Sequence, residues 1–333
     1  MQDRMQSGSR VLDLVYAGVF GSLFPLFLWA ARAFTRRSRG YDIADNVIRG
    51  FIRCRPKYLD AVRSNVSQVL GLPVTHPKVE DTALRIMKNH AYAWVDFFFF
   101  GQKPLAVGAA AFRQVVGLEH LDGAAAGGKG AILLTAHAGN FELGGLLLKL
   151  RNMKVHAVYK PDRFEAVERL RDRIRSQGGV VGIPVGGTGF ATLPLVALLR
   201  EGKLVGMQGD RDFSLNGLPI PFFGRKAYFP RGPWELAAMT GAAVVICFFH
   251  ADEDGRFHAR FSEPMHIQGE RGKRMAAIEE GMRAYAASLE ALIREHPDQW
   301  YCFYPFWDDP LRRRDESGSD HQDPMPGFPA PGL

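Results

Sequence analysis

The chain contains few cysteines, and their spacing excludes two ways of stabilising a fold. Its 333 residues include three cysteines, Cys54, Cys247 and Cys302, which lie far apart and form no Cys-x-x-Cys pair. A disulfide framework or a zinc site needs more ligands at closer spacing. We therefore expect neither a disulfide nor a metal site, and a reducing compartment suits such a chain.

Several catalytic and binding signatures are also absent. The sequence has no Gly-x-Ser-x-Gly element for a serine nucleophile and no Gly-x-Gly-x-x-Gly element for a dinucleotide. Its basic residues are not gathered into one face or a known nucleic-acid-binding motif, so we expect no nucleic-acid partner. The formal net charge of +7 is a mild excess that suits an anionic lipid or a phosphate-bearing small molecule.

One long apolar run lies near the N-terminus. Leu14 to Ala31 are 18 residues without a charge, which reaches the lower limit of about 17 to 25 residues for a membrane-spanning helix. Four arginines follow it (Arg32, Arg36, Arg37, Arg39) and two precede it (Arg4, Arg10). The positive-inside bias then places the rest of the chain in the cytoplasm. We predict a membrane anchor over residues 1–35; a buried helix or a helix lying in the interface is the alternative.

The next segments are expected to be helical, over 41–70 and 79–101. The second ends in four consecutive phenylalanines, whose alternatives are core packing or contact with acyl chains. At the other end of the chain, residues 315–333 are rich in Asp, Ser, Gly and Pro and have little to bury. We predict that this tail is disordered.

Between these ends, apolar runs alternate with amphipathic segments from residue 111 onward. Strands are expected within 112–121, 130–137, 154–160, 180–185, 203–210, 242–252 and 256–264, and helices within 141–151, 164–179, 191–202, 233–241 and 274–297. This alternation predicts an α/β domain over residues 36–314, with a mostly parallel central sheet flanked by helices. The apolar run at 130–137 is typical of a strand covered on both faces.

That buried strand ends at His137, and Glu142 follows five residues later. On one continuous helix such a spacing rotates two side chains by roughly 140° apart. They meet only if His137 lies in the turn before a helix, which Gly139 allows as a bend and Asn140 favours as an N-cap. We then expect the Glu142 carboxylate to hydrogen-bond the imidazole, so that the other ring nitrogen accepts a proton from a hydroxyl. A purely structural histidine is the alternative.

The motifs resemble those of a known family. They read, in order, RSNVSQVLG, TAHAGNFELGG, VYKP, RDRIRSQGG, GDRDFSLNGLPIPFFGRKAYFPRGP and HPDQWYCFYPFW. Together they resemble the bacterial lipid A late (lauroyl/myristoyl) acyltransferases, within the glycerolipid acyltransferase superfamily, over nearly all of residues 10 to 310. The resemblance implies an α/β core, an active site on the cytoplasmic side of the bacterial inner membrane, and acyl transfer from a thioester of acyl carrier protein or coenzyme A to a hydroxyl. It implies no metal and no tightly bound cofactor.

The resemblance also implies roles for particular residues. His137 would be the general base and Glu142 its partner, while Arg175 would clamp a phosphate or the oxyanion. Asp210 falls where an acidic residue lines the site. Lys160 stands where the family usually has arginine, which keeps the charge but loses bidentate phosphate binding. With these we predict a substrate-binding set of Asn140, Lys160, Arg175, Asp210, Arg211 and Asp212.

The acceptor and the function class leave alternatives. A lipid A precursor or a related glycolipid is the expected acceptor, and a lysophospholipid or an aminoacyl-lipid route is the alternative. From another class, the chain could be a catalytically silent lipid-binding protein, or a soluble nucleotide-dependent enzyme built around the Gly-Gly-Thr-Gly turn at 186–189. The intact pair of His137 and Glu142 favours the enzyme.

Overall fold

A computed structural model describes residues 36–159, 161, 165–185, 192–212, 215–268 and 273–308. The predicted anchor over residues 1–35, Lys160, the turn at 186–189 and the predicted tail over 315–333 lie outside these ranges. Within the described ranges, no helix combines the length and the apolarity that crossing a membrane requires.

An eight-stranded sheet forms the centre of the fold. Seven strands follow the order β1-β9-β8-β2-β5-β3-β4, and β10 pairs with β8. Their bounds are β1 Phe112–Val116, β2 Ala131–Thr135, β3 Val155–Tyr159, β4 Val180–Pro184, β5 Leu204–Gln208, β8 Ala243–Ala251, β9 Phe257–Phe261 and β10 Met265–His266. The five strands from β8 to β4 are parallel, while β9 runs antiparallel to β8. The predicted α/β class with a mostly parallel sheet is confirmed.

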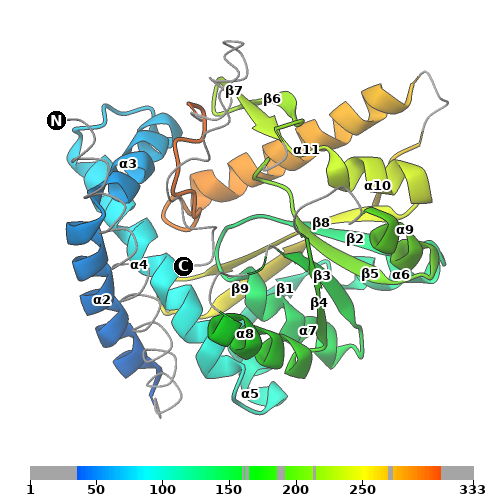
Figure 1. The fold of residues 1–333 in the computed structure, drawn as a ribbon, viewed down its shortest axis with the longest axis horizontal. Coiled ribbons are helices and arrows are strands. Elements are labelled where there is room, and N and C mark those ends of the chain that lie inside the picture. The colour runs from blue at the N-terminus through cyan, green and yellow to red at the C-terminus, as the bar shows by residue number, and fades with distance from the viewer. Residues whose placement is uncertain are drawn as a thin grey trace.

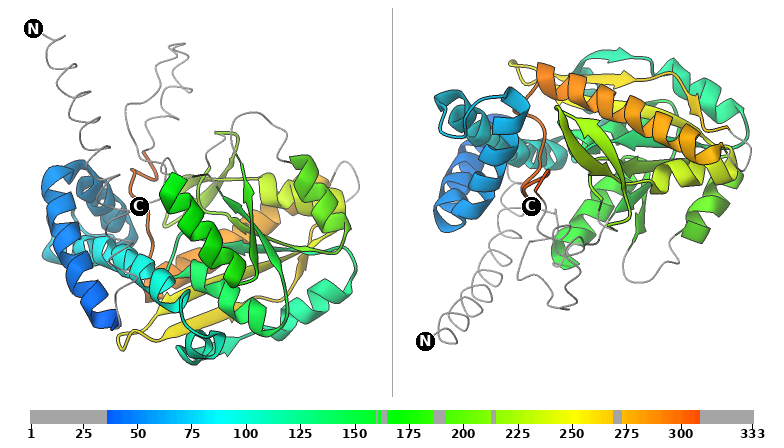
Figure 2. Two further views of the ribbon diagram at one scale, coloured as in Figure 1. Left: turned by 60° about the horizontal axis from the view of Figure 1, so that its bottom comes forward. Right: turned by 90° about the horizontal axis from the view of Figure 1, so that it is seen from above.

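Helices cover both faces of this sheet (Figures 1 and 2). Successive side chains of a strand point to opposite faces, so each face of β2 belongs to a different core. Ile132 and Leu134 pack with α9 Thr192–Arg200, α10 Gly232–Thr240 and α11 Arg274–Glu295, whereas Leu133 packs with α6 Glu119–Ala126 and α7 Gly144–Leu150. The long apolar run in this strand is therefore explained by burial on both faces.

Three helices at the start of the described chain form a layer beside the sheet, drawn in blue and cyan in Figure 1. They are α2 Arg37–Cys54, α3 Pro56–Leu70 and α4 Pro77–Phe100. The segment 41–70, predicted to be helical, is divided between two helices, because Pro56 provides no amide hydrogen and begins a new helix at its first position. The phenylalanines that end α4 are largely core residues, since Phe97, Phe98 and Phe100 are buried.

A two-stranded hairpin occupies part of the segment after β5 in which we expected no regular structure. It pairs β6 Leu218–Phe222 with β7 Arg225–Phe229, and it packs against α11. Pro219 and Pro221 conceal it in the sequence, because proline is rare in strands except at edges. The remaining α-helices of the described fold are α5 Leu105–Ala110 and α8 Glu165–Gln177.

Candidate active site

The predicted bend after the central strand is present and tightly fixed. His137 follows β2 by two residues, and Gly139 has a φ of +58°. The Gly139 amide donates to the Gln299 carbonyl at 2.7 Å, and the Asn140 amide donates to the Phe249 carbonyl at 3.1 Å. The loop that carries His137 is therefore held between β8 and the segment that follows α11.

Replacing Gly139 by alanine is expected to destabilise the protein by at least about 3 kcal/mol, because the new methyl group combines backbone strain with a clash. A Cβ at this position would lie 1.5 Å from the Phe249 carbonyl oxygen. The free energy of unfolding in urea measures the effect. Gly123→Ala is the matched control, since Gly123 lies in α6 with no atom within 4 Å of a Cβ. A loss below about 1 kcal/mol for Gly139→Ala would contradict this account of the bend.

The carboxylate that holds the His137 ring belongs to Asp210. Its Oδ1 lies 2.8 Å from His137 Nδ1 and accepts the His137 backbone amide at 3.1 Å. Its Oδ2 accepts the Trp300 indole N–H at 3.2 Å. Asp210 directly follows Gly209 at the end of β5, which is the sheet neighbour of β2, so both side chains emerge at the carboxyl edge of the sheet.

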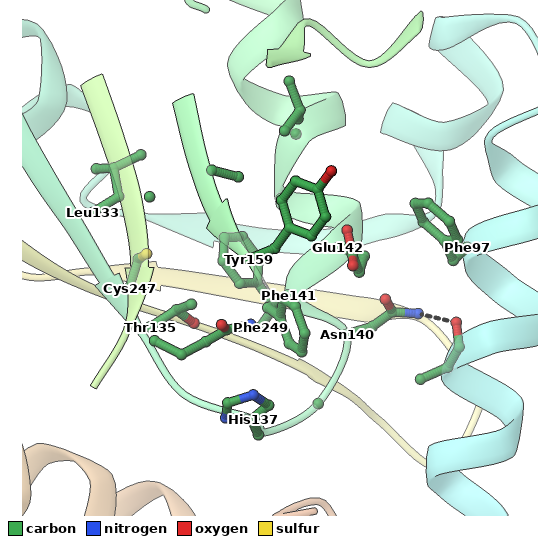
Figure 3. A pocket seen from close by; sticks show the side chains of 18 of the residues that line it. Phe97, Leu133, Thr135, His137, Asn140, Phe141, Glu142, Tyr159, Cys247 and Phe249 are labelled. Carbon is green, nitrogen blue, oxygen red and sulfur yellow. Dashed lines mark hydrogen bonds between the residues drawn. The ribbon is translucent and has the colours of Figure 1, made fainter. Parts of the chain in front are cut away.

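The predicted hydrogen bond between His137 and Glu142 is wrong. Glu142 lies in a 3₁₀ turn, η1 Phe141–Leu143, and its carboxylate accepts hydrogen bonds from Arg175, one of them from Nε at 3.1 Å. Arg171, one helical turn earlier in α8, lies 3.7 Å from the same carboxylate. Figure 3 shows the Glu142 carboxylate pointing away from the His137 ring. The 3₁₀ turn directs it toward the two arginines, and its catalytic role stays a prediction.

Charge and burial give the two carboxylates the same ionisation state. Burial alone would raise the pKa of Glu142, but the charges and hydrogen bonds of Arg175 and Arg171 outweigh it and hold that pKa below its usual range. Burial also opposes ionisation of Asp210, yet its contacts with His137 and the charge of Arg211 lower its pKa. Both groups are therefore anionic at neutral pH.

His137 itself is neutral at pH 7. Burial lowers the pKa of its imidazole, and the charge of Arg211 lowers it further, against the opposing influence of Asp210. Because Asp210 is anionic, Nδ1 of the neutral ring carries the proton and donates to it. Nε2 is left as the acceptor that a general base requires. The ring keeps 15% of its side-chain area exposed.

A cavity of about 180 Å³ adjoins this pair, between the sheet and α7 (Figure 3). Its apolar walls include Leu133, Leu148, Val155, Val180, Phe249 and Phe261. Its polar lining includes His137, Glu142, Arg171, Arg175, Arg211 and His90. The arrangement offers a neutral base and cationic groups in the wall of one apolar space, which suits an acyl chain with a reactive carbonyl.

The remaining predicted residues have distinct positions. Asn140 is buried, lines the cavity and occupies the N-cap position of η1 as predicted. Its side-chain amide donates to the Ala93 carbonyl at 3.1 Å and makes no capping hydrogen bond. Asp212 accepts the Gly217 amide at 2.7 Å and shapes the loop that leads to β6. Arg175 lines the cavity while engaged by Glu142, so its role as a substrate clamp stays a prediction.

Two contributors to the site escaped prediction as site residues. Trp300 holds Asp210, and His90 lines the cavity with its ring against Tyr301 and Phe303. Trp300 lies in the motif HPDQWYCFYPFW, which carries the resemblance but assigned no role to this residue. His90 has no such signal, and both come from segments far from His137 along the chain. Within the described residues, no group of three or more His, Cys, Asp or Glu side chains is arranged to hold a metal ion.

Comparison with known proteins decides the family. A family model described as bacterial lipid A biosynthesis acyltransferase matches residues 5–308. The chain belongs to this family. It is an acyltransferase, and the resemblance predicted from the motifs is confirmed.

Three relatives of this lipid A acyltransferase family member are themselves named acyltransferases. The phosphatidylinositol mannoside acyltransferase of Mycobacterium tuberculosis (strain CDC 1551 / Oshkosh) is 29% identical over 256 residues, 74% of this chain and 77% of the relative. The protein of the same name from Mycolicibacterium smegmatis is 26% identical, over 74% of this chain and 79% of the relative. The lipid A biosynthesis acyltransferase of Haemophilus influenzae is 26% identical over 289 residues, 79% of this chain and 85% of the relative.

Proposed function

We propose that this acyltransferase moves a fatty acyl group from an acyl thioester to a hydroxyl of a glycolipid. The observation that carries the proposal is the neutral His137, held by Asp210 in the wall of an apolar cavity. An acyl chain fits the apolar walls, and the reacting carbonyl then lies beside the base. A glycolipid acceptor is supported by the names of the relatives, which act on phosphatidylinositol mannoside or in lipid A biosynthesis.

The chemistry is a direct transfer. Nε2 of His137 accepts the proton of the acceptor hydroxyl while the hydroxyl oxygen forms a bond to the thioester carbonyl carbon. The carbonyl oxygen thereby becomes an oxyanion. The oxyanion collapses, the carbon–sulfur bond breaks, and the departing thiolate takes the proton from His137. Asp210 stabilises the imidazolium that exists between the two proton transfers. No acyl-enzyme is required.

The donor and the location belong to the same proposal. We propose acyl carrier protein or coenzyme A as the thiol carrier, because a thiolate is a good leaving group and the motif resemblance implies it. We also propose the cytoplasmic side of the bacterial inner membrane as the location. The uncharged run from Leu14 to Ala31 and the arginines after it support this, as does a lipid acceptor.

The test is a transfer assay with the full-length protein in mild detergent. Palmitoyl-coenzyme A and acyl-acyl carrier protein are the donors, and a phosphatidylinositol mannoside, a lipid A precursor and a lysophospholipid are separate acceptors. We expect acylated glycolipid by mass spectrometry. His137→Ala should leave no measurable transfer, because the base is lost, while circular dichroism shows an intact fold.

The controls separate the alternatives. His76→Ala removes an exposed histidine that caps α4 and lies outside the cavity, and it should transfer at the wild-type rate. Product from the lysophospholipid alone would assign a different acceptor class. Binding of lipids without thioester consumption by wild type would support the silent lipid-binding protein and refute the enzyme.

A further inference from the structure

Arg211 differs from the other two arginines of the cavity in what surrounds it. It directly follows Asp210, lines the cavity and is 6% exposed. Its Nη2 donates to the Tyr301 carbonyl, and its buried Nε, like Arg171 Nε and Arg175 Nη1, has no hydrogen-bond partner among the described residues. Arg171 and Arg175, by contrast, share the carboxylates of Glu142 and Glu168.

Arg211 therefore brings a buried positive charge to the site without forming an ion pair. Among the described residues, no carboxylate is close enough to pair with it, and its hydrogen-bond acceptor is a neutral carbonyl. Burying an unpaired guanidinium is costly, and a chain commonly avoids that cost by pairing or exposing it. A cation kept in this state at a reaction cavity suits an anion that forms only during the reaction.

The position of Arg211 relative to the base is fixed through one residue. The Tyr301 amide donates to the His137 carbonyl at 2.8 Å, and the Tyr301 carbonyl accepts Arg211. Asp210 and Arg211 are consecutive residues that both contact the neighbourhood of His137. Asp210 hydrogen-bonds the imidazole, and Arg211 is anchored to Tyr301, which binds the His137 backbone. Their nearness is also electrostatic, because the charge of Arg211 lowers the pKa of His137 and contributes to a pKa of about 3 for His90 after burial.

We propose that Arg211 is a further catalytic residue, whose guanidinium stabilises the oxyanion formed from the thioester carbonyl. The inference rests on the proposed function. When the hydroxyl oxygen bonds to the carbonyl carbon, the carbon–oxygen π pair moves onto oxygen, and the proton moves to His137 Nε2. Arg211 donates to that oxygen until the carbonyl re-forms and the thiolate leaves. The role predicted for Arg175 thereby passes to an arginine that forms no ion pair with a carboxylate of the described residues.

The first experiment is a kinetic comparison of wild type and Arg211→Ala, with palmitoyl-coenzyme A and whichever acceptor wild type uses. Removing one oxyanion-stabilising donor is expected to lower kcat by about 10²- to 10³-fold, with both KM values close to wild type. Guanidinium chloride at a few millimolar should restore part of kcat, and sodium chloride at the same concentration should not. Arg173→Ala, on the exposed side of α8, is the control expected to keep wild-type kinetics.

A second readout separates catalysis from a merely structural role. His137 acts only when neutral, and the charge of Arg211 helps to keep its pKa low. Without that charge the pKa rises, so the acidic limb of the kcat/KM profile should move to higher pH in Arg211→Ala and stay in place in Arg173→Ala.

The kinetic results for the Arg211 variants support or overturn its role in stabilising the oxyanion. A raised acceptor KM with unchanged kcat would assign Arg211 to binding a phosphate of the acceptor and overturn the proposal. If the alanine variant does not fold, Arg211→Lys and Arg211→Gln are compared: lysine should keep more of kcat than glutamine, and equal, full activity of both would overturn it. Wild type without any transfer would refute the proposed function and this inference together, whereas an active wild type with an unimpaired Arg211→Ala would refute only the inference.

Discussion

Replacing Asp210 by asparagine is expected to lower kcat for acyl transfer by about 10³- to 10⁴-fold while the protein stays folded. The wild-type carboxylate accepts hydrogen bonds from the Nδ1–H of His137 and from the Trp300 indole N–H. An amide in its place does not stabilise the imidazolium, and its NH₂ group favours the tautomer whose Nδ1 is an acceptor. His137 then presents a protonated Nε2 to the acceptor and no longer serves as a base. Steady-state kinetics of the transfer reaction measure the loss.

The control for this variant is Asp254→Asn, which changes an exposed aspartate that pairs with Arg113 on the surface. It should keep wild-type kcat, because surface ion pairs contribute little. Circular dichroism and the thermal midpoint show whether Asp210→Asn is folded. A folded Asp210→Asn enzyme with kcat within tenfold of wild type would exclude Asp210 as the group that orients and charges the base.

Replacing Glu142 by glutamine is expected to lower the free energy of unfolding by about 3–5 kcal/mol. Arg171 and Arg175 are each 6% exposed, so among the described residues Glu168 would be the carboxylate left in an ion pair with these two buried charges. Their nearest contacts to that carboxylate are 3.5 Å and 3.9 Å, longer than the 3.1 Å bond from Arg175 Nε to Glu142. Urea denaturation followed by tryptophan fluorescence measures the change.

Two further variants show whether the lost charge of Glu142 causes the loss of stability. Glu263→Gln alters an exposed glutamate five residues after His258, the same spacing as Glu142 from His137, and should leave stability unchanged. The double variant Glu142→Gln, Arg175→Met removes one charge of each sign and should recover part of the stability. If Glu142→Gln unfolds at the same urea concentration as wild type, the ion-pair network is not what holds α8 against the turn of η1.

Local sequence patterns predicted the helices and strands of the α/β sheet and the bend that follows its central strand. The alternation of apolar runs predicts the α/β sheet, and the buried run before His137 predicts a strand covered on both faces; both are confirmed. Gly139 was correctly expected at a bend, since its φ of +58° excludes most other residues. Local patterns such as these depend on neighbours in the chain, which a single sequence displays directly.

The pairing of side chains within the site was not predictable in the same way. His137 and Asp210 are 73 residues apart and meet because β5 lies beside β2, although β3 and β4 intervene along the chain. Glu142 and Arg175 are 33 residues apart and meet through the packing of α8. Short spacing suggested Glu142 as the partner of His137, but sheet order decides which carboxylate reaches the ring.

Which carboxylate supports His137 as the base is measured most directly by the ratio of kcat for Asp210→Asn to kcat for Glu142→Gln. The comparison is made at a temperature where circular dichroism shows both variants folded. We expect Asp210→Asn to be slower by at least about 10²-fold, because Asp210 is the one of these two carboxylates that hydrogen-bonds the imidazole. Glu142→Gln should stay within about tenfold of wild type once it is folded, since its carboxylate acts through two arginines. The opposite ranking, with Glu142→Gln the slower enzyme, would show that Asp210 is not the carboxylate that supports the base.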